Sequence, residues 1–186
     1  MSEFDFNTAS EQRDFDLIPD KTDAVVQMHL REGNAGEDGL LKRSNNGQAE
    51  MLDCEFIVVG GEYAKRRFWT NMVLSGTTDG HAQAANITNS RLRAILESAR
   101  GIKPQDVSEA AKKARIAELR DFEGIRFMAR IGVEPAKGEY RAKNILLSVI
   151  TPDQKEWHPI EQVEQPLMHT APRTDAKTIV KPAWAQ

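Results

Sequence analysis

Apolar and polar residues alternate along most of the chain, which predicts a protein built mainly from β-strands. In residues 23–33, for example, Val26, Met28 and Leu30 point to one side and the polar residues between them to the other. A period of two is typical of a strand with one buried face. The same alternation recurs in four later segments, residues 49–59, 62–76, 124–134 and 139–152. We therefore expect five strands.

Glycine-containing turns separate several of these segments. Asn46-Gly47 is typical of a type I′ hairpin turn, because both central residues of that turn need positive φ. Gly60-Gly61 and the sequence Pro-Ala-Lys-Gly at 135–138 are suited to two further chain reversals. The strands joined in this way are expected to be antiparallel.

Between the third and fourth predicted strands the period changes to that of a helix. Apolar residues within 89–101 recur every three or four positions, which predicts an amphipathic helix that ends at Gly101. A second helix is expected over 106–122, with Asp106 and Glu109 as its capping pair. Both helices form one insertion between two groups of strands.

The predicted fold is mainly β, of the α+β class. Three strands, a helical insertion and two more strands are the element order of a five-stranded antiparallel oligonucleotide-binding (OB) barrel. An irregular α+β sandwich has a similar order, so both architectures stay open. The chain divides into an acidic N-terminal arm at 1–20, an OB-like domain at 21–152 and a proline-punctuated C-terminal tail at 153–186.

Charge is distributed unevenly, although the 186-residue chain has a net charge of only −3. Residues 1–61 contain 5 basic and 13 acidic side chains, residues 62–144 contain 16 and 10, and residues 145–186 contain 4 and 5. The middle of the chain is therefore basic in a protein that is acidic overall. A local basic face of this kind is suited to phosphate groups.

The composition, with 40% hydrophobic and 28% charged residues, is typical of a globular protein. No apolar run approaches the length of a membrane span. The acidic N-terminus lacks the basic and apolar regions of a signal peptide. We therefore expect a cytoplasmic protein with no membrane association.

Residues that commonly build active sites or metal centres form no recognisable motif. Cys54 is the single cysteine and falls in an apolar strand pattern, where we expect a small buried hydrophobe. The four histidines are scattered without a ligand spacing. Nucleophile-elbow, phosphate-loop and dinucleotide glycine patterns are absent from the sequence. The expectation is no metal, no cofactor and no enzymatic activity.

Cations stand beside aromatic residues in the sequence Lys-Arg-Arg-Phe-Trp at 65–69. Strand alternation places Arg67, Trp69 and Asn71 on one face and Phe68 in the core. Single-stranded nucleic acid is held by cations along its backbone and by aromatic rings on which bases stack. The candidates for such a site are Lys42, Arg43, Lys65, Arg67, Trp69, Asn71, Arg126, Arg130, Lys137, Tyr140, Arg141 and Lys143.

Each candidate also has a simpler interpretation. Outward-facing cations on strands are common as solvated surface that resists aggregation. Trp69 has an alternative place as a cover for the helical insertion or the N-terminal arm. Asp53 and Glu55 fall on the face of Trp69, where their negative charge repels phosphate. The ligand path is therefore expected nearer the turn between the last two strands.

Several segments together resemble a family of small bacteriophage and prophage proteins. They are residues 4–22, 52–69, 91–102, 122–134 and 140–152. Members of this family are regarded as phage single-stranded-DNA-binding proteins of the replication and recombination module. The resemblance, which covers about residues 4–152, implies an OB-like fold and a role in coating single strands. It supplies no individual binding residues.

The resulting expectation is a non-enzymatic single-stranded-DNA-binding protein in the cytoplasm of a bacterial host. The alternative is an adaptor or inhibitor that acts on a replication or recombination enzyme. A phage recombinase or replication protein is a candidate partner of the tail. The sequence leaves open the oligomeric state, a homodimer included, the choice between DNA and RNA, and whether the acidic arm competes with DNA.

Overall fold

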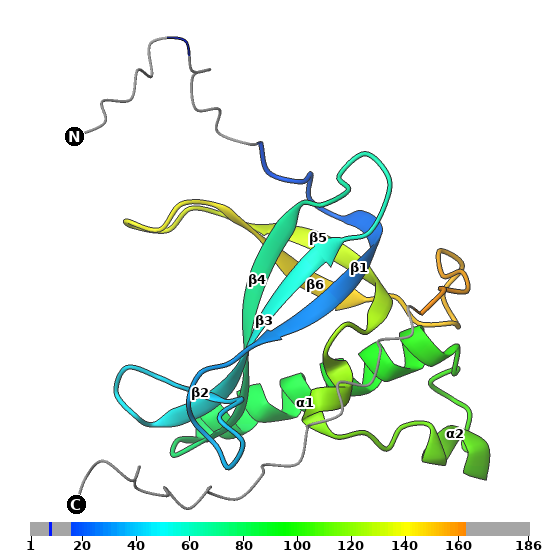
Figure 1. Ribbon diagram of the computed structural model, residues 1–186, viewed down its shortest axis with the longest axis horizontal. Helices are drawn as coiled ribbons and strands as arrows, with labels where there is room; N and C mark the ends of the chain where they lie inside the picture. The colour runs from blue at the N-terminus through cyan, green and yellow to red at the C-terminus, as the bar shows by residue number, and fades with distance from the viewer. Residues whose placement is uncertain (1–7, 9–15, 163–186) are drawn as a thin grey trace, which may run out of the picture.

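A computed structural model describes residue 8 and residues 16–162 of the chain. These residues form one antiparallel sheet of six strands with three helical segments (Figure 1). The strands are β1 (Thr22–Arg31), β2 (Lys42–Arg43), β3 (Ala49–Val58), β4 (Arg67–Gly76), β5 (Arg126–Glu134) and β6 (Lys143–Val149). The helical segments are α1 (Asp79–Arg100), α2 (Glu109–Lys113) and the 3-10 helix η1 (Leu119–Phe122). The prediction of a mainly β, α+β protein is confirmed.

Strand β3 is the centre of the sheet pairing. One edge of β3 pairs with β4 from end to end, and its other edge pairs with β1 and, further along, with β2. β1 also pairs with β5, and β5 pairs with β6. The sheet therefore runs β4-β3-β1-β5-β6, with the short β2 beside β3 beyond the end of β1.

The sheet curls but does not close, which corrects the prediction of a complete barrel. β4 and β6 approach within 8 Å between Cα atoms. No ladder joins them among the described residues. Side chains of Leu17, Thr70 and Ile145 line the space between the two strands, where a closed barrel would have backbone hydrogen bonds.

The strand faces follow the predicted alternation closely. Phe56 of β3 stacks on Phe68 of β4 at 5.1 Å between ring centroids and meets Phe127 of β5 edge-on at 6.0 Å. All three rings are fully buried, so these contacts form the middle of the core. The alternation over 124–134 predicts that Met128 faces outward with Arg126 and Arg130. Met128 is buried instead, because its strand also packs against α1 and against the segment after β6.

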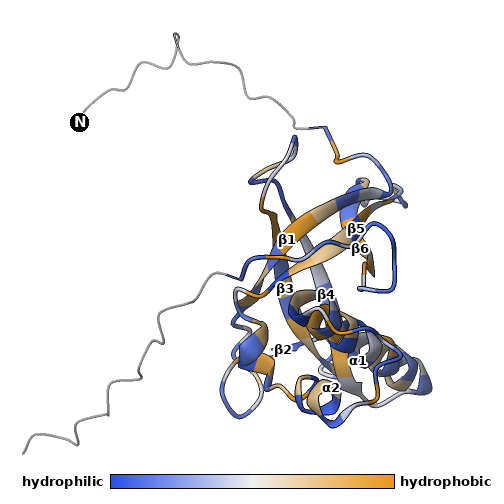
Figure 2. Cartoon of the chain, turned by 90° about the vertical axis from the view of Figure 1, so that its right-hand side faces the viewer, coloured by the Kyte–Doolittle hydropathy of each residue, from blue (hydrophilic) through white to orange (hydrophobic). Residues whose placement is uncertain are grey.

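Helix α1 lies across one end of the curled sheet in both views (Figure 1, Figure 2). It begins at Asp79 rather than at residue 89, because Thr78 caps a polar first half that has no apolar period. It ends as predicted at Gly101, which has the left-handed φ of 67° that glycine tolerates. The helix contacts β4, β5 and β6 and closes that end of the core.

The predicted second helix over 106–122 is mostly irregular. Only α2 and η1 are helical there, and Ser108 rather than Asp106 is the cap of α2. The cause is Arg115, whose guanidinium turns inward to donate to the carbonyl oxygens of Lys103, Pro104 and Asp106. Those bonds hold the segment as a loop around one arginine.

A buried carboxylate anchors this loop to α1. Glu97 is 3% exposed, and its Oε1 accepts from Arg93 Nε at 2.9 Å and from Arg115 Nε at 2.7 Å. A carboxylate removed from water in this way needs such partners, because an unpaired buried charge is strongly destabilising. Glu97 therefore couples the helix to residues 102–118.

The turn between β2 and β3 differs from the predicted type I′ geometry. Gly47 has a φ of 69°, but Asn46 is not among the residues with positive φ. Ser44 and Ala49 are joined by backbone hydrogen bonding, so the loop is longer than a two-residue turn. The short β2, which sequence alternation did not reveal, is the other arm of this hairpin.

Described parts of the predicted arm and tail pack on the domain. Ile18 is buried, and Asn144 of β6 binds both its backbone N–H, at 2.9 Å, and its carbonyl oxygen, at 2.8 Å. At the other end, Trp157 donates to the carbonyl oxygen of Ser98, and Gln162 binds the backbone of Arg126. The rest of the predicted arm and tail lies outside the described residues, apart from Thr8.

Replacing Glu97 by Gln should lower the free energy of unfolding by about 3 kcal/mol, because the largely covered guanidinium of Arg115 loses its counter-charge. Urea unfolding followed by circular dichroism measures this. Glu109→Gln is the matched control, since the side chain of Glu109 is 89% exposed and pairs with the exposed Lys112. Its effect should stay below about 0.5 kcal/mol. Equal effects of the two variants would contradict a structural role of Glu97.

Candidate functional site

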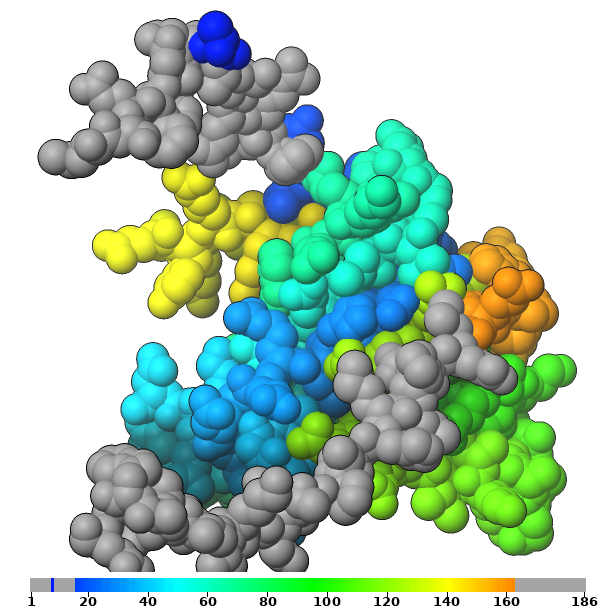
Figure 3. Space-filling view, in the orientation of Figure 1, coloured from blue at the N-terminus to red at the C-terminus, as the bar shows by residue number. Residues whose placement is uncertain are grey.

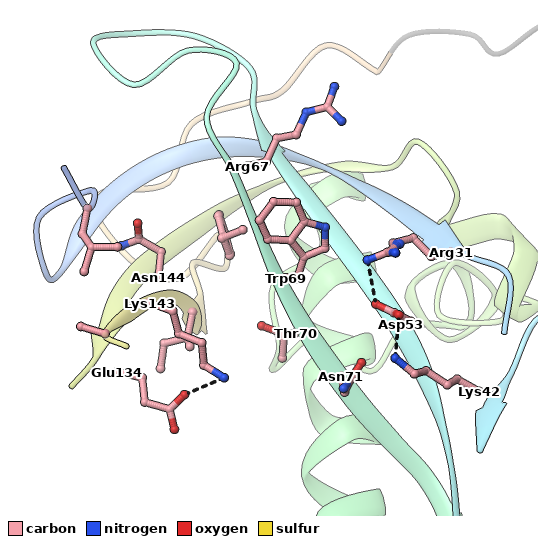
Figure 4. A pocket seen from close by; sticks show the side chains of 14 residues that line it. Arg31, Lys42, Asp53, Arg67, Trp69, Thr70, Asn71, Glu134, Lys143 and Asn144 are labelled. Carbon is pink, nitrogen blue, oxygen red and sulfur yellow. Dashed lines mark hydrogen bonds and ion pairs between the residues drawn. The ribbon is translucent and has the colours of Figure 1, made fainter. Parts of the chain in front are cut away.

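A groove of about 610 Å³ crosses the face of β4 between β6 on one side and the β1–β3 surface on the other (Figure 4). The space-filling view shows the molecule hollowed there, between the yellow β5–β6 hairpin and the blue to cyan region around β2 (Figure 3). The lining residues are Leu17, Arg31, Lys42, Asp53, Arg67, Phe68, Trp69, Thr70, Asn71, Glu134, Ala142, Lys143, Asn144 and Ile145.

Strand register arranges the outer face beside this groove in rows. Trp69 of β4 is opposite Glu55 of β3, and Glu55 is opposite His29 of β1. One step along the strands, Asn71 is opposite Asp53, which is opposite Arg31. The sequence prediction that the two carboxylates share the face of Trp69 is therefore confirmed.

The indole of Trp69 is held in place by Glu55. Trp69 is 48% exposed, and its Nε1 donates to Glu55 Oε2 at 3.2 Å. The other oxygen, Oε1, accepts from Arg67 at 2.7 Å. One carboxylate thus fixes the ring edge and neutralises the nearest cation, while much of the ring stays open to solvent. Trp69 does not serve as a cover for α1.

A second carboxylate, Asp53, lies within ion-pair distance of two cations from different strands. Lys42 of β2 donates to Asp53 at 3.1 Å, and Arg31 of β1 lies 3.9 Å from its other oxygen. The close approach of β2 depends on Gly33, since a Cβ at that position would lie 2.5 Å from the Cα of Lys42. A residue without a side chain therefore brings Lys42 to the groove.

The hairpin between β5 and β6 projects past the sheet (Figure 1) and borders the hollow seen in the space-filling view (Figure 3). Lys137, Tyr140 and Arg141 are exposed on it, and the Tyr140 side chain is 82% exposed. Lys143, at its base, pairs with Glu134 at 3.0 Å. The hairpin thus offers one aromatic ring and two cations, Lys137 and Arg141, that form no ion pair with a carboxylate of the described residues.

The groove brings together only part of the predicted site. Lys42, Arg67, Trp69, Asn71 and Lys143 line it, and the hairpin residues stand beside it. The other candidates lie elsewhere and are engaged in local contacts or turns.

Each of these other candidates has a definite place. Arg43 pairs with Glu50 at 3.2 Å on the hairpin of β2. Lys65 has a φ of 69° in the turn before β4 and is absent from the groove lining. Arg126 donates to Gln27. Arg130 makes a two-pronged contact with Asp23, whose hydrogen bonds raise the pKa of the guanidinium.

Other lining residues escaped the sequence reasoning. Alternation over 23–33 places Arg31 on the outer face with Gln27 and His29. The sequence did not show that β1 would pair with β3 so that Arg31 lies opposite Asp53. Thr70 has a buried hydroxyl with no hydrogen-bond partner among residue 8 and residues 16–162. Thr70 lies at the edge of the sheet because, among the described residues, β4 pairs with β3 and not with β6.

Cys54 lies beneath this face and is fully buried, as predicted. Burial, and secondly the charge of Asp53, raises the pKa of its thiol to about 12. Arg91 of α1 acts in the opposite direction, and burial lowers the pKa of Arg91 itself. At neutral pH the thiol is therefore protonated and inaccessible.

Within residue 8 and residues 16–162, no group of three or more His, Cys, Asp or Glu side chains is placed to hold a metal ion. In the same part of the chain, no helix has the length and apolar character needed to cross a membrane. Comparison with known proteins gives no match, either to a protein-family model or to a curated protein sequence.

Cys54 should react with Ellman's reagent only when the protein unfolds. A rise of the pKa from 9.0 to about 12 lowers the thiolate fraction at pH 8 by about a thousandfold. The absorbance of the released thiolate, followed in buffer and in urea, measures this. Rapid stoichiometric reaction of the native protein would contradict the buried position.

Proposed function

We propose that the groove binds single-stranded DNA without catalysing a reaction. The observation that carries this proposal is the exposed, immobilised ring of Trp69 at the centre of an open groove with cations on both sides. A base stacked on such a ring contributes about 1–3 kcal/mol. The phosphates on either side of it would meet Lys42 at one end and the hairpin cations at the other.

The sheet order supports an OB-like fold for this function. In an OB fold the ligand lies on the face of the second and third strands, between the loop that joins strands one and two and the loop that joins strands four and five. The order β4-β3-β1-β5-β6, with α1 between β4 and β5, agrees with that arrangement. On this proposal the groove would correspond to that strand face and the β5–β6 hairpin to one of the two loops.

Ion pairs within the groove lower its positive potential. Arg67, Lys42 and Lys143 each have a carboxylate partner at 2.7–3.1 Å. The affinity of the site would therefore rest more on stacking, and on Lys137 and Arg141, than on the cations that line the groove. This is consistent with the sequence expectation that the ligand path is displaced toward the hairpin.

The same ion pairs favour a second candidate, a protein-binding adaptor. A surface of alternating carboxylates and cations beside exposed Trp69 and Tyr140 also resembles a protein interface, where aromatic and arginine side chains carry much of the affinity. A phage recombinase or replication protein is the proposed partner in that case. Most of the tail that is predicted to contact this partner lies outside the described residues.

Trp69→Ala should weaken binding of a labelled mixed-sequence 30-nucleotide single strand by about tenfold or more, because one stacking platform is lost. Fluorescence anisotropy at 50 mM salt measures the affinity, with the matching duplex as competitor. Ile116→Ala, an exposed apolar residue of the loop before η1, is the control and should bind normally. If the unaltered protein binds no single strand at low salt, the adaptor becomes the better proposal.

A Lys137→Gln/Arg141→Gln double variant should reduce the slope of log affinity against log salt by about 1.4, since about 0.7 counterions are released per phosphate contact of a single strand. Affinity titrations between 50 and 300 mM salt give the slope. The control is Lys112→Gln/Lys113→Gln on α2, which lies away from the hairpin (Figure 1). An equal fall in slope for both would indicate a general charge effect.

A further inference from the structure

We infer that the groove distinguishes among bases, favouring those with an amino group and disfavouring thymine. This inference rests on the proposed function and concerns the same site. Its basis is the kind of polar group that surrounds Trp69. The groups nearest the ring on the β3 side are carboxylates, and a carboxylate only accepts hydrogen bonds.

Two carboxylates flank the position of a base stacked on Trp69. Glu55 is directly opposite Trp69 in the register, and Asp53 is one step along, opposite Asn71. Both side chains are on the outer face and partly accessible. Figure 4 shows the indole with its nitrogen turned toward β3 and Asp53 standing below it on the same strand.

Both carboxylates keep acceptor capacity. A carboxylate has about four lone-pair positions. Glu55 uses one for Arg67 and one for Trp69. Asp53 receives one short hydrogen bond, from Lys42, because the contact with Arg31 is 3.9 Å long. Each therefore has room for a donor from a bound base.

The nearby cations do not offset this preference. Arg67 and Lys42 already donate to the two carboxylates, and the Trp69 N–H is also committed to Glu55. Each cation keeps further N–H groups, but cytosine and thymine both offer two acceptor atoms to them, so the cations serve the two bases alike. The unused lone pairs of the carboxylates are therefore the feature that separates bases with an amino group from thymine.

The four bases differ in what they offer to such a surface. Cytosine and adenine each carry an amino group, and guanine carries an amino group as well as a ring N–H. Thymine has a carbonyl oxygen where cytosine has its amino group, and its one ring N–H lies between two carbonyl oxygens, which repel an approaching carboxylate. Contact of Asp or Glu with the cytosine amino group is an established mode of base recognition.

The comparison of cytosine with thymine isolates this effect, because both are pyrimidines of the same size. A good polar contact to a base edge discriminates by roughly 5- to 150-fold. With carboxylates that are already partly engaged, we expect an oligo-dC to bind about tenfold more tightly than an oligo-dT of equal length. The ratio should be nearly independent of salt, since phosphate contacts are common to both strands.

The test measures binding of 20-nucleotide oligo-dC and oligo-dT to the full chain by fluorescence anisotropy at pH 8 and several salt concentrations. Asp53→Asn and Glu55→Gln, alone and combined, should bring the dC to dT ratio toward one. Glu134→Gln is the matched control. It removes the same charge from the groove rim, where Glu134 pairs with Lys143, and should leave the ratio unchanged.

Thermal melting establishes that each variant is folded, and the single variants give the answer if the combined one is not. Equal affinity for dC and dT, or tighter binding of dT, overturns this inference and leaves single-strand binding in place. An unchanged ratio in the Asp53 and Glu55 variants overturns the role of these carboxylates. Failure of both oligonucleotides to bind overturns the proposed function, and the base preference with it.

Discussion

The pairing of β3 with two neighbours at once determines most of what this molecule presents to solvent. Because β4 and β1 both hold β3 in a single register, Phe56 must face Phe68 and Phe127 in the core. The same register sends Glu55 and Asp53 to the opposite face, beside Trp69. A shift of one residue would exchange the two sets. The register that forms the apolar cluster on one face of the sheet therefore also forms the polar groove on the other face.

The site also depends on parts that are distant in the chain. Lys42 reaches Asp53 because β2 returns close to the end of β1 at Gly33. The hairpin wall is held by β5 and β6, whose position depends on α1 and on the Ile18 contact of Asn144. Stability at the far end of the sheet, where Glu97 is buried, thus supports the geometry of the groove indirectly.

The sequence predicted the strand faces correctly where the alternation of residues had one physical cause, the burial of apolar side chains on one side of the sheet. Alternation identified the inward rows of β3 and β4, including Cys54 and Phe68, because only those faces bury apolar surface. It failed for Met128, which is covered by α1 and the segment after β6, and for residues 106–122, where Arg115 organises a loop. Both outcomes depend on contacts between segments far apart in the chain.

The candidate site shows the same division. Arg67, Trp69 and Asn71 could be assigned to one face from alternation alone, and Asp53 and Glu55 were expected beside them. The sequence did not reveal that Glu55 binds both Arg67 and Trp69, or that Arg130 is taken up by Asp23. Whether a cation is available to a ligand depends on its partner, and partners are set by register between strands.

The unclosed edge between β4 and β6 has a mechanical consequence. In a closed barrel, widening the space between two adjacent strands would break a row of backbone hydrogen bonds. Here, among the described residues, only side-chain contacts span that gap. Widening that gap would therefore break no ladder of the sheet, and its width is set by side-chain packing alone.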